Sequence, residues 1–194
     1  LQSLFAKKNK NQFTKFSMVR FGNVLDSSGS VIPKFRNQIM QRLPVTVTDP
    51  QITRFFMTIK EAAELLLQSS AMAQGGDVFL LDMGRPVKIY DLACQMIELS
   101  GLKIKDIENP QGDIEITNLG IRSGEKLHEE LLIDAKAKNT FHPLIYKAYE
   151  KSIPYDQLIS ILEDMKLAII DNNKSEVLNS LIKVVPELKT DLKS

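Results

Sequence analysis

The apolar positions of the chain recur with two different periods, one typical of strands and one typical of helices. Short β-branched or apolar runs predict strands at 16–21, 45–48, 78–81 and 114–117. Apolar residues spaced three and four positions apart predict helices at 31–40, 58–73, 87–100, 155–170 and 175–185, and a further helix that begins near Gly124. Strands that alternate with helices predict an α/β fold.

The sequence shows no glycine-rich first strand and loop of the kind that opens a dinucleotide-binding sheet. No strand is followed by a G-x-G-x-x-G or G-x-x-x-x-G-K-[ST] phosphate loop. The predicted strands are also few and widely spaced for a complete doubly wound sheet. Leu1–Lys8 reads as the tail of a helix already under way. We therefore expect a piece of a longer protein, made of the last strands of such a sheet and a smaller α/β lobe.

Composition narrows the function classes. The chain has 194 residues, 43% of them hydrophobic, and a formal net charge of +1, which gives no general argument for nucleic-acid binding. No apolar run is long enough to span a membrane. Cys94 lies in an apolar helical pattern, which favours a buried thiol over a nucleophile. His128 and His142 lack metal-ligand spacing and are interpreted as ordinary imidazoles.

Two polar clusters lie in the first third of the chain. Arg20–Asn23 directly follows a predicted strand, and ligands of open α/β sheets lie beyond the carboxyl ends of strands. Gly29–Phe35 opens a helix, whose N-terminus attracts phosphate. Both have structural alternatives. Asn23 can bond its own turn backbone, and Lys34 can be a solvated charge at an ordinary loop-to-helix junction.

Two further clusters combine an arginine with a turn. In Thr48–Phe56, Arg54 lies between a turn and two aromatic residues, and its planar guanidinium suits a pyrophosphate. An equally good alternative is an ion pair with Asp49. In Arg122–Lys126, an arginine, a glycine and a carboxylate can hold phosphate and ribose together. Alternatively, the carboxylate simply favours the first turn of a helix. None of the clusters is decisive alone.

Taken in order, the clusters resemble the C-terminal part of the UDP-N-acetylglucosamine 4,6-dehydratase family, the CapD-like polysaccharide-biosynthesis dehydratases of bacteria. These enzymes are extended short-chain dehydrogenases/reductases. The resemblance covers about residues 1–135, and we expect 136–194 to be a helical C-terminal extension. The matching stretches are 19–35, 44–68, 75–93 and 121–132.

The resemblance implies an NAD(P)-dependent enzyme whose catalytic residues lie upstream, so no catalytic residue and no metal ligand is expected here. The expected partners are a UDP-sugar and the missing N-terminal Rossmann half. Apolar surface left by that half predicts self-association into a homo-oligomer. The stretches 48–58 and 75–87 look most like the membrane-anchored branch. They imply a cytoplasmic domain of a protein anchored in the bacterial inner membrane.

Carried over position by position, the resemblance also implies site residues. Phe21 and Gly22 should lie near the nicotinamide. Two departures stand out, because Asp26 occupies a position where the family usually has Gly, and Ser123 replaces the usual Pro. The expected substrate contacts are Asn23, Val31, Pro33, Lys34, Val47, Arg54, Arg122 and Glu125.

Three functions follow as hypotheses. The first is the substrate-binding portion of a 4,6-dehydratase, inactive alone and without bound cofactor. The second is the same portion of a UDP-sugar 4- or 5-epimerase. The third, of another class, is a stand-alone nucleotide-sugar binding or assembly module.

Overall fold

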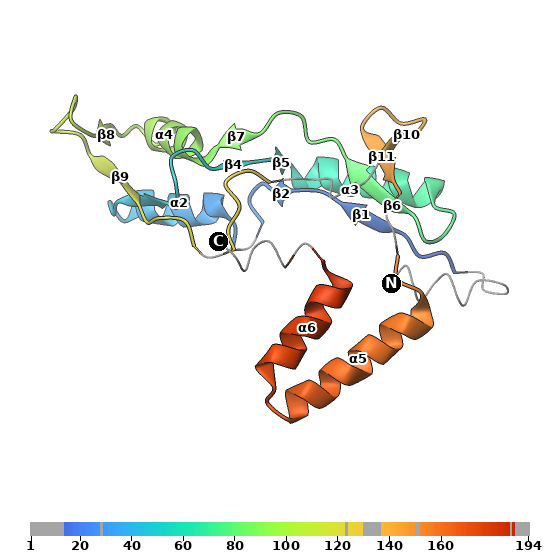
Figure 1. The fold of residues 1–194 in the computed structure, drawn as a ribbon. Coiled ribbons are helices and arrows are strands. Elements are labelled where there is room, and N and C mark those ends of the chain that lie inside the picture. The colour runs from blue at the N-terminus through green and yellow to red at the C-terminus, as the bar shows by residue number, and fades with distance from the viewer. Residues whose placement is uncertain are drawn as a thin grey trace. The chain divides into compact units, whose positions relative to one another are not determined.

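The computed structural model describes residues 14–27, 29–122, 124–129, 137–149, 152–186 and 188. They form two compact units, of which unit 2 comprises Val19–Met72 and Phe79–Ala148, and unit 1 the remaining described residues. In chain order (Figure 1) the elements are β1 (Met18–Arg20), β2 (Asn23–Val24), α2 (Val31–Met40), β3 (Val45–Val47), β4 (Thr53–Arg54), β5 (Phe56–Met57), α3 (Ile59–Met72), β6 (Val78–Leu81), β7 (Val87–Lys88), α4 (Ile89–Leu99), β8 (Ile104–Lys105), β9 (Ile114–Asn118), β10 (Lys138–Asn139), β11 (Ile145–Ala148), α5 (Tyr155–Ile170) and α6 (Lys174–Val184).

The strands of the described chain pair into small sheets. One has the order β1-β6-β11-β10, and a second is the parallel sheet β3-β9-β8. Two ribbons complete the set: β2 pairs in parallel with β5, and β4 pairs antiparallel with β7. The β2–β5 register sets Asn23 beside Phe56, and the β4–β7 register sets Arg54 opposite Val87. These two ribbons therefore fix the backbone positions of Asn23 and Arg54, two of the predicted substrate-binding residues.

The core of unit 2 lies between helices α2 and α4 and the sheet β3-β9-β8. Phe35 from α2, Ile97 from α4 and Ile114 from β9 are almost fully removed from solvent within this cluster. Burying a side chain of this size stabilises the fold by about 1.5–3 kcal/mol. The first turn of α2 and the start of α4 are thus anchored from within.

Helix α3 begins with the capping box that its sequence predicts. The Thr58 hydroxyl accepts a hydrogen bond from the Glu61 amide at 3.1 Å, and the Glu61 carboxylate accepts from the Thr58 amide at 2.8 Å. The hydrogen bonds that the Glu61 carboxylate accepts from the Thr58 amide and, at 2.8 Å, from the Thr58 hydroxyl hold the pKa of Glu61 below its ordinary value. The cap therefore depends on an ionised carboxylate.

Unit 1 contains a helical hairpin in which α5 and α6 pack side by side (Figure 1). The Asn173 side chain caps α6 by accepting a hydrogen bond from the Glu176 amide at 3.2 Å. The preceding Asn172 has a φ of 53°, which ends α5 and turns the chain. Both helices lie where the apolar spacing predicts them.

The predicted elements that lie within the described residues are mostly present, with one clear error. The predicted helix after Gly124 is wrong for 124–129, which are not helical, and Leu131 and Leu132 lie outside the described residues. The backbone explains the difference, because Gly124 has a φ of 81° and the Thr53 amide donates to the Leu127 carbonyl at 3.1 Å. Pairing with β4 replaces helical bonds there.

A smaller difference concerns 87–88, which form β7, so that α4 begins at Ile89. The strands β10 and β11 were not predicted, and the proposed division of the chain at residue 135 stays a prediction.

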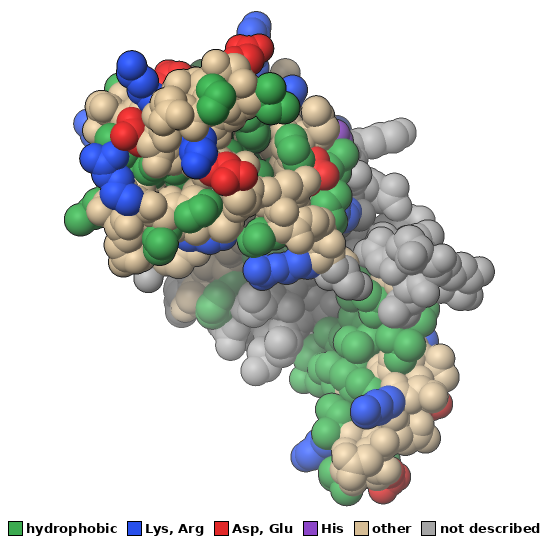
Figure 2. All heavy atoms as spheres, turned by 90° about the vertical axis from the view of Figure 1, so that its left-hand side faces the viewer, with side chains coloured by type: hydrophobic (Ala, Val, Ile, Leu, Met, Phe, Trp, Pro, Cys, Tyr) green, Lys and Arg blue, Asp and Glu red, His purple; other side chains and the backbone are tan. Residues whose placement is uncertain are grey.

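The surface seen in Figure 2 mixes basic, acidic and hydrophobic side chains, without one large patch of a single charge. Among the helices that the structure describes, each is too short or too polar to span a bilayer.

Candidate functional site

A cleft of about 570 Å³ opens within unit 2, where β2, the first turn of α2, β4 and the segment 122–125 meet. This volume falls within the range typical of small-molecule sites, roughly 300–1,000 Å³. Apolar side chains of Ile52, Phe56 and Ile89 form part of its wall. The polar and charged lining consists of Asn23, Ser27, Ser30, Lys34, Thr48, Arg54, Arg122 and Glu125.

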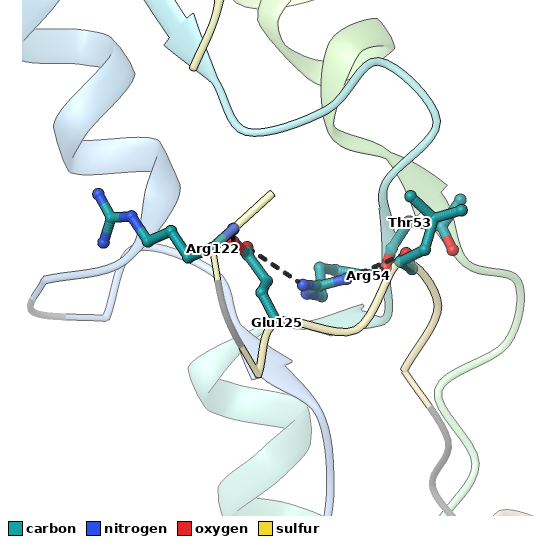
Figure 3. Close-up of polar contacts among 5 residues, drawn as sticks. Thr53, Arg54, Arg122 and Glu125 are labelled. Carbon is teal, nitrogen blue, oxygen red and sulfur yellow. Dashed lines mark hydrogen bonds and ion pairs between the residues drawn. The ribbon is translucent and has the colours of Figure 1, made fainter. Parts of the chain in front are cut away.

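Arg54 is tied down by three hydrogen bonds at the edge of the cleft (Figure 3). Its Nη1 donates to the carbonyl oxygens of Thr53 at 2.8 Å and Leu127 at 3.3 Å, and its Nη2 donates to Glu125 Oε1 at 3.5 Å. The Arg54 and Glu125 side chains are only 17% and 26% exposed. The ion pair with Asp49, left open by the sequence, is not the one that forms.

The guanidinium keeps capacity for a ligand. An arginine has five N–H donors, and the three bonds of Arg54 in the described part of the chain leave two of them for other acceptors. A phosphate oxygen pair suits such a planar donor set. Arg54 is therefore held in place while two of its N–H donors stay available to a ligand.

Arg122 and Glu125 belong to one tight turn. The Glu125 amide donates to the Arg122 carbonyl at 3.0 Å, and the Arg122 amide donates to Glu125 Oε2 at 3.5 Å. The positive φ of Gly124 makes this turn possible. In Figure 3 the Arg122 side chain extends away from Arg54 and toward α2. The two guanidinium groups consequently sample different parts of the cleft.

The first turn of α2 contributes backbone amides and an unsatisfied hydroxyl. Ser30 precedes the helix without capping it through its side chain, and its Oγ is buried with no partner among the described residues. Lys34, one turn on, donates to the Thr46 carbonyl at 3.4 Å. A helix N-terminus of this kind favours anions.

The loop before α2 turns at Asp26, whose backbone is left-handed. Asp26, at a position where the family usually has Gly, has a φ of 61°, in the region that favours glycine. Its carboxylate pairs with Arg36 Nη1 at 3.0 Å. The turn forms with aspartate at this position, because an aspartate tolerates this conformation better than most residues.

The formal charge of the cleft is positive. Its charged lining consists of Lys34, Arg54 and Arg122 against Glu125, so three cations and one carboxylate give +2. The whole chain carries only +1. Positive charge is thus concentrated at this cleft.

The structure brings six of the predicted substrate residues to the cleft: Asn23, Val31, Lys34, Arg54, Arg122 and Glu125. Pro33 and Val47 do not line it. Val47 is 2% exposed, and its carbonyl accepts from the Leu119 amide at 2.9 Å. The neighbouring Thr48 faces the cleft instead.

The two predicted cofactor contacts lie outside the cleft lining as well. The Gly22 amide donates to the Met83 sulfur at 2.6 Å, and a Cβ on Gly22 would lie 3.1 Å from that sulfur. Phe21 is 37% exposed. Ser123, the second departure from the family pattern, lies outside the described residues.

Sequence reasoning missed the contacts that hold the site together. Thr53 and His128 are 75 positions apart, yet Thr53 Oγ1 lies 2.8 Å from His128 Nδ1. Their backbones also form an isolated parallel bridge. Such a contact leaves no local signal, because it depends on how two distant segments pair.

Cys94 is less buried than its helical pattern predicts, and its thiol is not activated. Its side chain is half-buried, and burial, followed by the nearby Asp91 and Glu98 carboxylates, raises the pKa of the thiol. A raised pKa disfavours the reactive thiolate. In the part of the chain that the structure describes, no three His, Cys, Asp or Glu side chains cluster as a metal would need.

Comparison with known proteins places these features in a family. Residues 1–150 match the family described as polysaccharide biosynthesis protein. The capsular polysaccharide biosynthesis protein CapD of Staphylococcus aureus is 58% identical over 141 residues, 73% of this chain and 21% of CapD. A UDP-glucose 4-epimerase of Rickettsia bellii is 34% identical over 127 residues, 66% of this chain and 34% of the epimerase.

The fold is likewise similar to a solved structure. The X-ray structure of Pen from Bacillus thuringiensis matches with a TM-score of 0.61 and 33% identity, over 79% of this chain and 45% of Pen. The predicted α/β fold class is confirmed. The chain spans about a fifth of the length of CapD and about a third of that of the epimerase. With a family match over residues 1–150 and an identity of 58% to CapD, the chain belongs to the polysaccharide biosynthesis protein family.

Proposed function

We propose that the cleft binds a UDP-sugar, and that the chain is the substrate-binding portion of an NAD(P)-dependent UDP-N-acetylglucosamine 4,6-dehydratase. The observation that carries the proposal is the +2 lining of the cleft, with Arg54 already oriented by Glu125. The diphosphate of a UDP-sugar is an anion, so its charge is opposite to that of the lining. The family membership supports the same interpretation.

Each charged residue has a distinct role in this proposal. Arg54 donates its two remaining N–H groups to the pyrophosphate, and Arg122 and Lys34 add charge from the side of α2. Glu125 accepts hydrogen bonds from ribose hydroxyls, because a carboxylate oxygen pair suits a vicinal diol. The Asn23 amide can both donate to and accept from the sugar. The chain binds and orients the substrate through these groups.

Phe21 and Gly22 are the residues of this chain that we propose to lie near the NAD(P) cofactor. NAD(P), when bound, supplies reversible hydride transfer at the sugar. The half-exposed Phe21 ring offers an apolar surface for contact, whereas the packing of Gly22 against Met83 is already filled by protein. Since 14–122 contain no glycine-rich phosphate loop, we expect this chain alone to show no measurable NAD(P) affinity.

The binding part of the proposal is tested by titrating the isotope-labelled chain with UDP and UDP-N-acetylglucosamine, and following amide shifts by NMR. We expect weak, saturable binding with shifts confined to 23–34, 48–56 and 122–125. Uridine, which lacks the diphosphate, serves as the control and should bind much less. Equal shifts with UDP and uridine, or shifts spread over both units, would refute a diphosphate site.

The catalytic part is tested on the longer protein that carries this chain. Incubated with UDP-N-acetylglucosamine, it should give a 4-keto-6-deoxy product whose mass is lower by one water. A UDP-sugar epimerase is the second candidate, favoured by the 34% identity to the Rickettsia enzyme. An epimerase would give a product of unchanged mass. Binding without any turnover would instead favour a binding or assembly module.

A further inference from the structure

Segment 125–128 lies against β4 through contacts that surround Arg54. The Thr53 amide donates to the Leu127 carbonyl at 3.1 Å, and the same carbonyl accepts from Arg54 Nη1 at 3.3 Å. Beside them, Thr53 Oγ1 lies 2.8 Å from His128 Nδ1. The contacts between β4 and segment 125–128 therefore run from the Arg54–Glu125 ion pair at one end to the Thr53–His128 contact at the other.

Through this arrangement, Thr53 and His128 affect the position of the Arg54 guanidinium. Two of the three acceptors that hold Arg54, namely Glu125 Oε1 and the Leu127 carbonyl, belong to segment 125–128. That segment is not helical, so no internal ladder of hydrogen bonds fixes its path. Apart from the bonds of Arg54 itself, the Thr53 amide and the Thr53 hydroxyl hold it beside β4. Loss of the side-chain bond leaves only the amide bond of Thr53, which weakens the hold on both acceptors of Arg54.

We infer that Thr53 and His128 are positioning residues, which hold segment 125–128 beside β4 so that Arg54 and Glu125 are aligned for the diphosphate and the ribose. This inference rests on the proposed function. Neither residue is part of the cleft lining. The hydroxyl and the imidazole nitrogen form one hydrogen bond, with the hydroxyl as donor or acceptor according to the tautomer.

The test compares removal of the bond with its conservative replacement. Thr53→Val and His128→Phe each keep the shape of the side chain and remove one partner. Thr53→Ser keeps a hydroxyl, and His128→Asn places a polar atom close to the position of Nδ1. The dissociation constants of UDP and UMP are measured by NMR titration for the wild-type chain and the four variants.

We expect Thr53→Val and His128→Phe to weaken UDP binding about three- to ten-fold, the loss of one hydrogen bond. The serine and asparagine variants should stay within about two-fold of the wild type. The two removal variants should weaken the binding of UMP less than that of UDP, because UMP offers fewer phosphate oxygens to Arg54. In an Arg54→Met background, Thr53→Val should weaken UDP binding less than it does in the wild type, because only the alignment of Glu125 is then left to lose.

Several results would overturn the inference while leaving the UDP site intact. These are unchanged UDP affinity in both removal variants, equal losses for UDP and UMP, or failure of the conservative variants to rescue binding. Because Thr53 and His128 are altered separately, misfolding of one variant leaves the other to decide. A wild-type chain that binds no UDP at all would refute the proposed function itself.

Discussion

Replacing Arg54 with Met gives the sharpest test of the cleft. Methionine keeps an unbranched side chain of similar length and removes the guanidinium. The formal charge of the lining falls from +2 to +1, because Lys34 and Arg122 then face Glu125. The Glu125 carboxylate, 26% exposed, also loses its partner. Both changes oppose the binding of an anionic diphosphate.

The expected loss follows from the donors that Arg54 has left. Hydrogen bonds to a charged group contribute about 1.5–3 kcal/mol each, and the site is partly open to solvent, so the low end applies. Two such bonds at about 1.5 kcal/mol each total about 3 kcal/mol for UDP, which corresponds to a rise of roughly a hundred-fold or more in the dissociation constant. Arg54→Lys keeps the charge without the planar fork and should lie between Met and wild type.

Calorimetry or NMR titration with UDP measures this effect, and Arg42→Met provides a matched control. Arg42 also forms an ion pair, with Asp113 at 3.2 Å, but its side chain is 60% exposed and does not line the cleft. Its replacement should leave UDP affinity unchanged. The reasoning fails if Arg54→Met binds UDP as tightly as the wild type, or if the Arg42 control loses as much.

Three further predictions concern stability. Glu61→Gln should lower the free energy of unfolding more at neutral pH than below about pH 4. A carboxylate with a lowered pKa stabilises the fold above its unfolded pKa, and this contribution is lost as the pH falls through the folded pKa. Urea unfolding at both pH values measures the difference. Ile97→Ala should lower the free energy of unfolding by about 2–5 kcal/mol, whereas Leu99→Ala, on the same helix but 88% exposed, should change it by less than about 0.5 kcal/mol. Asp26→Gly should alter it by less than about 1 kcal/mol, while Asp26→Val should cost more, because a β-branched residue is strained at a φ of 61°; thermal melts compare the two.

The elements with strong periodicity could be predicted from the sequence. The α4 face that contains Ile89, Ala93 and Ile97 is buried as its spacing implies, and the continuous apolar run of β6 is buried throughout. The capping box at Thr58 also forms as its spacing predicts. In each case the information lies within one turn or one strand, so local physics decides the outcome.

The short ribbons could not be predicted in the same way. The strands β2, β4, β5 and β7 have two residues each, and such lengths carry no period. The prediction for the segment after Gly124 is wrong because a glutamate near a glycine also suits a helix start. Its non-helical path includes a hydrogen bond to β4, which lies about seventy positions earlier in the chain. Val47 lies at the end of a strand, where ligands often bind, but its side chain packs into the core.

The site residues that the sequence predicts and those that it misses differ in one physical respect. A ligand-facing residue must expose a charge or amide next to a turn, and that combination is visible in the sequence at Asn23, Arg54 and Glu125. A positioning residue acts through one hydrogen bond to a distant segment, so Thr53 and His128 resemble ordinary surface residues. The charge of the cleft can therefore be predicted from local sequence, whereas the alignment of Arg54 depends on how β4 and segment 125–128 pair. If the Thr53 and His128 variants lose UDP affinity as expected, much of the precision of this cleft resides in residues outside its lining.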